Sequence, residues 1–100
     1  METALASTSD VPRGKMIGVQ KGDKSVLIAN VGGTYYAIGN TCTHMHCKIS
    51  EGTLSGEQAQ CPCHGSIFNV MTGAVIRGPA GAPEPSYTVK VSLDQIMVDI

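Results

Sequence analysis

Two short motifs constrain this chain more than any other feature: Cys42-Thr43-His44 and Cys61-Pro62-Cys63-His64. Each supplies a thiolate and an imidazole, and sixteen residues lie between them, enough to fold one loop back against the other. All four cysteines and all three histidines fall between positions 42 and 64, which indicates a binding site rather than a fold-wide disulfide framework. Two sulfur and two nitrogen donors can bind zinc or an iron–sulfur cluster with mixed ligands. The spacings alone leave a structural zinc module and an electron carrier both open.

Length and charge limit the classes of protein to which the chain can belong. One hundred residues predict a single domain, and a formal net charge of −1 without charge blocks argues against nucleic-acid binding through phosphate contacts. No apolar run approaches the ~20 residues that span a bilayer, and residues 1–10 lack the features of a signal peptide. The sequence therefore predicts a soluble protein without a membrane anchor, and we expect a cytoplasmic location.

Strand patterns dominate the chain, and no stretch sustains a helical period. Gly32-Gly33 suits a two-residue hairpin turn, whereas residues 78–85 are too rich in glycine and proline for a strand and predict an ordered loop. Short strands separated by turns predict an all-β antiparallel sandwich or open barrel. We expect residues 1–10 to be loosely ordered and residues 11–100 to form one domain. The predicted strands are Lys15–Val19, Ser25–Asn30, Thr34–Ile38, Ser66–Val70, Ala74–Ile76, Tyr87–Val91 and Gln95–Ile100.

The residues around the two motifs make the pattern far more specific. Cys47 follows the first motif, and Gly65-Ser66 follows the second. Together with their context, the motifs resemble the cluster-binding signature of Rieske iron–sulfur proteins, and the resemblance extends from about Val11 to Ile100. The matching context is Ile38-Gly39-Asn40, Glu51-Gly52-Thr53-Leu54, Phe68, Thr72-Gly73 and Gly78-Pro79-Ala80.

The resemblance implies one 2Fe-2S cluster per chain, held by two cysteines and two histidines. By this analogy, Cys42 and Cys61 bind the inner iron as thiolates, and His44 and His64 bind the outer iron through imidazole nitrogens. It also implies a β-sandwich with a small cluster-binding subdomain of two loops, at about residues 40–70.

The resemblance assigns roles to further residues near the cluster. Cys47 and Cys63 match a disulfide pair of the respiratory branch of the family, although two buried free thiols remain the alternative. Ser66 matches a serine that hydrogen-bonds a bridging sulfide, and Gly78 with Pro79 matches a loop that covers the cluster. Phe68 stands where the respiratory branch has a tyrosine that hydrogen-bonds a cysteine ligand, which predicts a lower reduction potential here.

The function implied is that of a one-electron carrier, a Rieske-type ferredoxin rather than an enzyme. We expect transient redox partners, a reductase on one side and an oxygenase or respiratory component on the other, and a monomeric protein. A zinc module with the same four ligands is the competing hypothesis. A third is a cluster domain cut from a larger subunit, against which the initiator-like Met1 and strand-like end at Ile100 favour a complete small ferredoxin.

Overall fold

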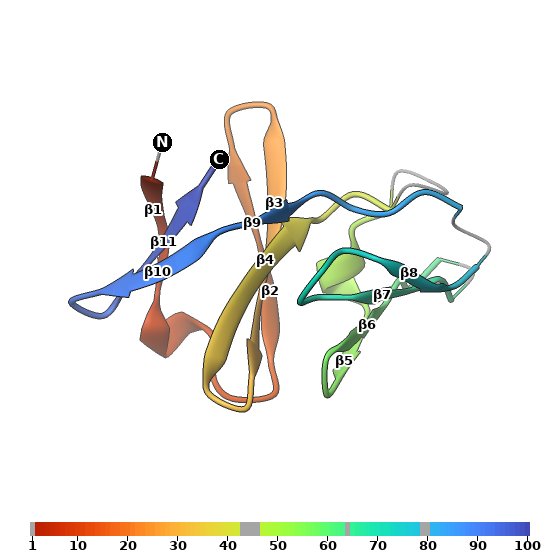
Figure 1. The fold of residues 1–100 in the computed structure, drawn as a ribbon, viewed down its shortest axis with the longest axis horizontal. Helices are drawn as coiled ribbons and strands as arrows, with labels where there is room; N and C mark the ends of the chain where they lie inside the picture. The colour runs from red at the N-terminus through yellow and green to blue at the C-terminus, as the bar shows by residue number, and fades with distance from the viewer. Residues whose placement is uncertain (1, 43–46, 64, 79–80) are drawn as a thin grey trace.

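The fold consists of three antiparallel sheets arranged in a row. The computed structural model describes residues 2–42, 47–63, 65–78 and 81–100. A terminal sheet has the strand order β1-β11-β10, a central sheet has the order β2-β3-β4-β9, and a small sheet has the order β5-β6-β7-β8. Figure 1 shows the terminal sheet on the left, the central sheet in the middle and the small sheet on the right. The predicted all-β antiparallel architecture is confirmed.

The described residues contain eleven strands and two short 3-10 helices. The strands are β1 Glu2–Ser7, β2 Met16–Lys21, β3 Lys24–Val31, β4 Thr34–Gly39, β5 Thr53–Ser55, β6 Gln58–Gln60, β7 Ile67–Asn69, β8 Val75–Arg77, β9 Ser86–Tyr87, β10 Val89–Ser92 and β11 Gln95–Asp99. The helices are η1 Thr8–Asp10 and η2 Ile49–Glu51. In the part of the chain that the structure describes, no helix has the length and hydropathy to cross a membrane.

Strand β3 lies between two hydrophobic cores and contributes side chains to both. Successive side chains of a strand point to opposite faces of the sheet. Val26 and Ile28 accordingly pack into the core shared with the terminal sheet, whereas Leu27 and Ala29 pack into the core shared with the small sheet. Because both faces are covered, the strand reads as a continuous apolar run rather than an alternating one.

The tight turns of the central sheet follow the glycines of the sequence. Gly32 and Gly33 connect β3 to β4 with φ angles of 61° and 98°. This left-handed conformation favours glycine, since other residues lose energy there through their β-carbon. Leu93 and Asp94 make the β10–β11 turn with φ angles of 50° and 67°, so this hairpin forms without glycine.

The N-terminal residues differ from the expectation of loose order. Glu2–Ser7 forms β1, which pairs with β11 at the far end of the chain. Leu5 and Ala6 of β1 pack against the core between the terminal and central sheets, and this burial orders the segment. Figure 1 accordingly shows the two termini side by side.

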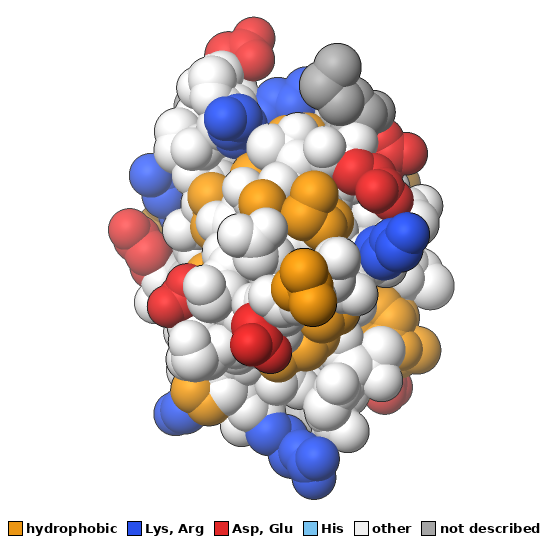
Figure 2. All heavy atoms as spheres, turned by 90° about the vertical axis from the view of Figure 1, so that its left-hand side faces the viewer, with side chains coloured by type: hydrophobic (Ala, Val, Ile, Leu, Met, Phe, Trp, Pro, Cys, Tyr) orange, Lys and Arg blue, Asp and Glu red, His pale blue; other side chains and the backbone are white. Residues whose placement is uncertain are grey.

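The face formed by the terminal sheet carries no dominant charge. Figure 2 looks onto this side and shows hydrophobic side chains in small patches among Lys, Arg, Asp and Glu side chains of both signs. Val91 and Leu93 of the β10–β11 hairpin are exposed. A mixed surface of this kind produces little long-range steering of charged partners.

Candidate metal centre

The first motif lies in a loop that is closed at its base by backbone hydrogen bonds. After β4 ends at Gly39, the Cys42 N–H donates to the Cys47 carbonyl oxygen at 2.8 Å, and Thr41 forms an isolated antiparallel bridge with Lys48. The Ile49 N–H donates to the Asn40 carbonyl oxygen at 2.7 Å. Backbone hydrogen bonds therefore hold together the two chain segments at the base of the loop.

The second motif lies in the connection between β6 and β7. The Cys61 N–H donates to the Ser66 carbonyl oxygen at 2.8 Å, which continues the pairing of Gln60 with Ile67 by one further step. Gly65 has a φ of 77°, a value that a residue with a β-carbon adopts only with strain. The connection is therefore a tight loop presented at the end of a hairpin.

A disulfide joins the two loops. Cys47 and Cys63 are bonded, with their Cα atoms 6.3 Å apart and sixteen positions apart in sequence. This is the pair that the resemblance implied. Both cysteines are half-buried and pack against the core between the central and small sheets. The cross-link fixes the two loops relative to one another, so that donors on both can face a common centre.

The two remaining cysteines, Cys42 and Cys61, are buried free thiols in the same core cluster. They are 3% and 1% exposed. Burial raises the pKa of the Cys61 thiol, a hydrogen bond from the Cys63 backbone opposes that rise, and the hydrogen-bonded Cys42 thiol and the Glu84 carboxylate add to it. Without a cation, the Cys61 thiol therefore keeps its proton at neutral pH.

The donor set fits an iron–sulfur centre. Cysteine binds metals as the thiolate, and a metal cation supplies the charge that a buried thiolate needs. Two neighbouring thiols that are buried and take no part in the disulfide could supply the sulfur half of a mixed ligand set. The predicted imidazole ligands, His44 and His64, lie outside the described residues.

The other predicted residues are placed as follows. Ser66 and Phe68 are fully buried, and Phe68 packs in the same core cluster as the two thiols. Gly78 is exposed at the end of β8. Pro79 lies outside the described residues.

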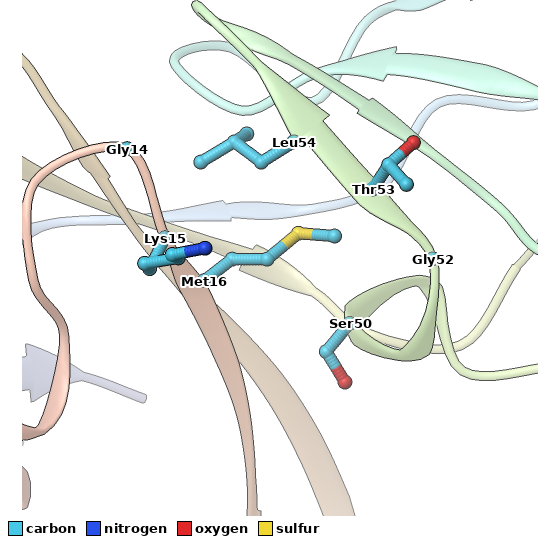
Figure 3. A pocket seen from close by; sticks show the side chains of 7 residues that line it. All are labelled: Gly14, Lys15, Met16, Ser50, Gly52, Thr53 and Leu54. Atoms are coloured by element: carbon cyan, nitrogen blue, oxygen red, sulfur yellow. The ribbon is translucent and has the colours of Figure 1, made fainter.

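Two hollows flank this region. One of about 440 Å³ reaches Cys61 and is lined by Glu51, Gly52, Thr53, Gln60, Cys61, Pro62 and Gly65. Another of about 250 Å³ lies between the start of β2 and the segment from η2 to β5 (Figure 3). Met16 and Leu54 project into it from opposite sides, and the described residues that line it include no cysteine or histidine.

Sequence reasoning gave no role to two buried polar residues that support the site. The side chain of Asn40 accepts from the Ser50 N–H at 2.8 Å and donates to the Ser25 hydroxyl at 3.1 Å, so it ties η2 to the central sheet. Glu84 is 5% exposed and lies in the segment 78–85, for which the glycines and prolines predicted an ordered loop. The sequence signal for Asn40 was its place two residues before the first motif, whereas Glu84 had no such signal.

Comparison with known proteins identifies the relatives of this chain. The family model described as "Rieske [2Fe-2S] domain" matches residues 1–91. The ferredoxin component of biphenyl 2,3-dioxygenase from Rhodococcus jostii (strain RHA1) is 34% identical over 98 residues, which cover 98% of this chain and 92% of that protein.

Solved structures agree with the sequence comparison. A ferredoxin from Sphingomonas yanoikuyae B1 superposes with a TM-score of 0.94 at 26% identity, over 100% of this chain and 99% of that one. A chain from a complex of reduced oxygenase and oxidized ferredoxin in carbazole 1,9a-dioxygenase superposes with a TM-score of 0.91 at 34% identity, over 97% and 91% of the two chains.

Proposed function

The chain belongs to the Rieske 2Fe-2S family, and on that basis we propose that it serves as the ferredoxin of an oxygenase system, receiving single electrons from a reductase. It is an electron carrier rather than an enzyme, and its cofactor is a Rieske 2Fe-2S cluster. The observation that carries the proposal is the pair of adjacent, buried free thiols of Cys42 and Cys61, each at the neck of a loop that the disulfide joins to the other.

The proposed ligands are Cys42 and Cys61 for the inner iron and His44 and His64 for the outer iron. When bound, a cluster with this ligand set supplies a one-electron acceptor with a potential of roughly −150 to +300 mV. Neutral imidazoles replace two anionic thiolates, so the ligand set carries two fewer negative charges than four cysteines. This is why the expected potential lies above that of an all-cysteine ferredoxin.

We propose that the remaining residues of the site exclude water from the cluster and fix the positions of its ligand loops. The core that surrounds Cys42 and Cys61, including Phe68, keeps solvent from the cysteine side of the centre. The disulfide between Cys47 and Cys63 holds the ligand loops together during reduction and oxidation. We assign Ser66 and the Gly78–Pro79 loop to the surroundings of the cluster, with the Ser66 hydroxyl as a hydrogen-bond donor.

The proposed partners are a reductase and an oxygenase. The similar chain in the carbazole 1,9a-dioxygenase complex was solved together with its oxygenase. We propose that docking uses an edge formed by His44, His64 and Pro79, because electron transfer weakens steeply with distance. We further propose that the contacts are transient, that the protein is a monomer and that it acts in the cytoplasm.

Low-temperature EPR of the dithionite-reduced protein tests this proposal. We expect a rhombic signal with an average g below that of all-cysteine two-iron ferredoxins, from protein that contains iron and acid-labile sulfide in equal amounts. A silent spectrum from metal-loaded protein contradicts the proposal and reassigns the four ligands to zinc.

Three histidine variants test the ligand assignment. His44→Ala and His64→Ala each remove a proposed ligand and are expected to abolish the Rieske signal. His46→Ala is the matched control, since it removes an imidazole from the same loop and is expected to leave the signal intact. Loss of the signal in the His46 variant alone contradicts the assignment.

A further inference from the structure

One buried carboxyl group near the site has no part in the function described so far. Among the described residues, Glu84 is the only acidic or basic side chain that is buried, at 5% exposed. Moving a carboxylate out of water is costly, so a buried carboxyl group is either neutral or ionised with surroundings that hold its charge. Glu84 lies on the connection from β8 back to β9, which returns from the small sheet to the central sheet (Figure 1).

The position of Glu84 is fixed from both sides. Its N–H donates to the Gly73 carbonyl oxygen at 2.8 Å, and the carbonyl oxygen of the next residue, Pro85, accepts from the Gly39 N–H at 2.9 Å. The carboxylate Oε1 rests on Gly39, where a β-carbon would collide with it. Gly39 lies three residues before Cys42, so the carboxylate is held beside the strand that leads into the first ligand loop.

The field of this carboxylate reaches the site. Glu84 contributes to raising the pKa of the Cys61 thiol, after burial and the neighbouring Cys42 thiol. Glu51 also lies near Cys61, across the hollow that both line, but its side chain is exposed to water. Solvent screens an exposed charge far more than a buried one, so the two carboxylates differ in effect although both are close.

We propose that Glu84 is ionised in the folded protein and sets the potential: its negative charge, held out of water against the end of the strand that leads to Cys42, lowers the reduction potential of the cluster. The inference rests on the proposed function, because it takes Cys42 and Cys61 as the cluster ligands. A fixed negative charge disfavours an added electron, and the low dielectric of the interior preserves that effect. Glu84 is thus a tuning residue that acts through space.

Replacing Glu84 by its neutral isostere tests the proposal. Glu84→Gln keeps the shape and the backbone hydrogen bonds, and we expect it to favour reduction by about tenfold, which is about 59 mV for a one-electron couple. Potentials are measured by protein-film voltammetry on loaded protein, with EPR g values recorded alongside. Glu51→Gln is the matched control and is expected to leave the potential nearly unchanged.

Further measurements separate charge from shape. Glu84→Asp keeps the charge and is expected to stay close to the unaltered potential; equal shifts in the Asp and Gln variants overturn the proposal. An unchanged potential in the Glu84→Gln variant, with the EPR g values of the unaltered protein, also overturns the proposal. If the Glu84→Gln variant does not take up the cluster, the reduced-minus-oxidised infrared difference spectrum of the unaltered protein is the deciding measurement. A carboxylate band in that spectrum that persists in the Glu51→Gln variant supports the proposal. The absence of such a band overturns it. A missing Rieske signal in the unaltered protein is the separate failure of the proposed function.

Discussion

Gly73 is the position at which a single methyl group is expected to disturb the contact between the small sheet and the β8–β9 connection. It is buried in the turn after β7 with a φ of 83°, and its carbonyl oxygen accepts the Glu84 N–H at 2.8 Å. A β-carbon at Gly73 would overlap the Glu84 carbonyl group. Because that obstacle is backbone, no side-chain rotation relieves it, and the connection itself has to move.

The loss in the free energy of unfolding has two parts. The left-handed backbone costs a non-glycine residue roughly 1–2 kcal/mol. Overpacking a filled site costs about 1–3 kcal/mol more. We therefore expect Gly73→Ala to lose roughly 2–5 kcal/mol.

Gly14 supplies a matched control that isolates the contact. Its φ is 81°, almost the value of Gly73, but a β-carbon there meets nothing within 4 Å. Gly14→Ala is therefore expected to lose only the backbone part, roughly 1–2 kcal/mol. The gain from reduced freedom of the unfolded chain is common to both variants and cancels in the comparison.

Guanidinium unfolding of the loaded protein, followed by far-UV circular dichroism and visible absorption, measures both losses. The difference between the two variants is expected to be about 1–3 kcal/mol, the part that belongs to the contact with Glu84. Equal losses refute the argument that the connection is packed against Gly73. A Gly14 variant as stable as the unaltered protein refutes the argument from φ.

Three further variants test other parts of the site. Replacing both Cys47 and Cys63 by serine opens a loop of sixteen positions and is expected to cost about 3 kcal/mol in the same titration, an effect that reducing the disulfide in the unaltered protein should reproduce. Phe68→Tyr places a hydroxyl in the core beside the thiols and is expected to raise the potential measured by voltammetry; an unchanged value shows that the ring does not point at a ligand. Asn40→Ala is expected to cost roughly 3 kcal/mol and to speed amide exchange of Ser50, whose N–H loses its acceptor; unchanged exchange contradicts that role.

The sequence predicted those parts of the fold that local chemistry determines. The apolar run of β3 and the two glycines after it are strong local signals, and the structure places a buried strand and a tight turn there. Strand β6 was not predicted, because Gln58–Gln60 offers one buried residue, Ala59, between two exposed glutamines. Its pairing with β5 and β7 stabilises it, and pairing between segments leaves little trace in a three-residue pattern.

Some residues of the site could likewise be predicted from local sequence, and others could not. Clustered cysteines and histidines mark a metal centre from sequence alone, because those side chains rarely gather for another reason. Glu84 could not be found by that route. Its burial depends on space left by Gly39, at the end of β4, and Gly73, in the turn after β7, which come together only in the folded chain. The prolines and glycines around Glu84 predicted an ordered loop, and nothing in that pattern indicated a buried carboxyl group.

Three sets of contacts between separate parts of the sequence hold the site in place. The disulfide joins the two ligand loops, Asn40 ties η2 to the central sheet, and the Glu84 N–H and Pro85 carbonyl bind the connection to two sheets. Groups that are positioned before a charge arrives need no rearrangement when it does, and a closely packed interior resists such rearrangement. Variants that loosen any of these contacts should therefore change stability and potential together. Glu84→Gln, which removes charge but keeps shape and the backbone hydrogen bonds, should change the potential with little change in stability, and that contrast separates the electrostatic role of Glu84 from its structural one.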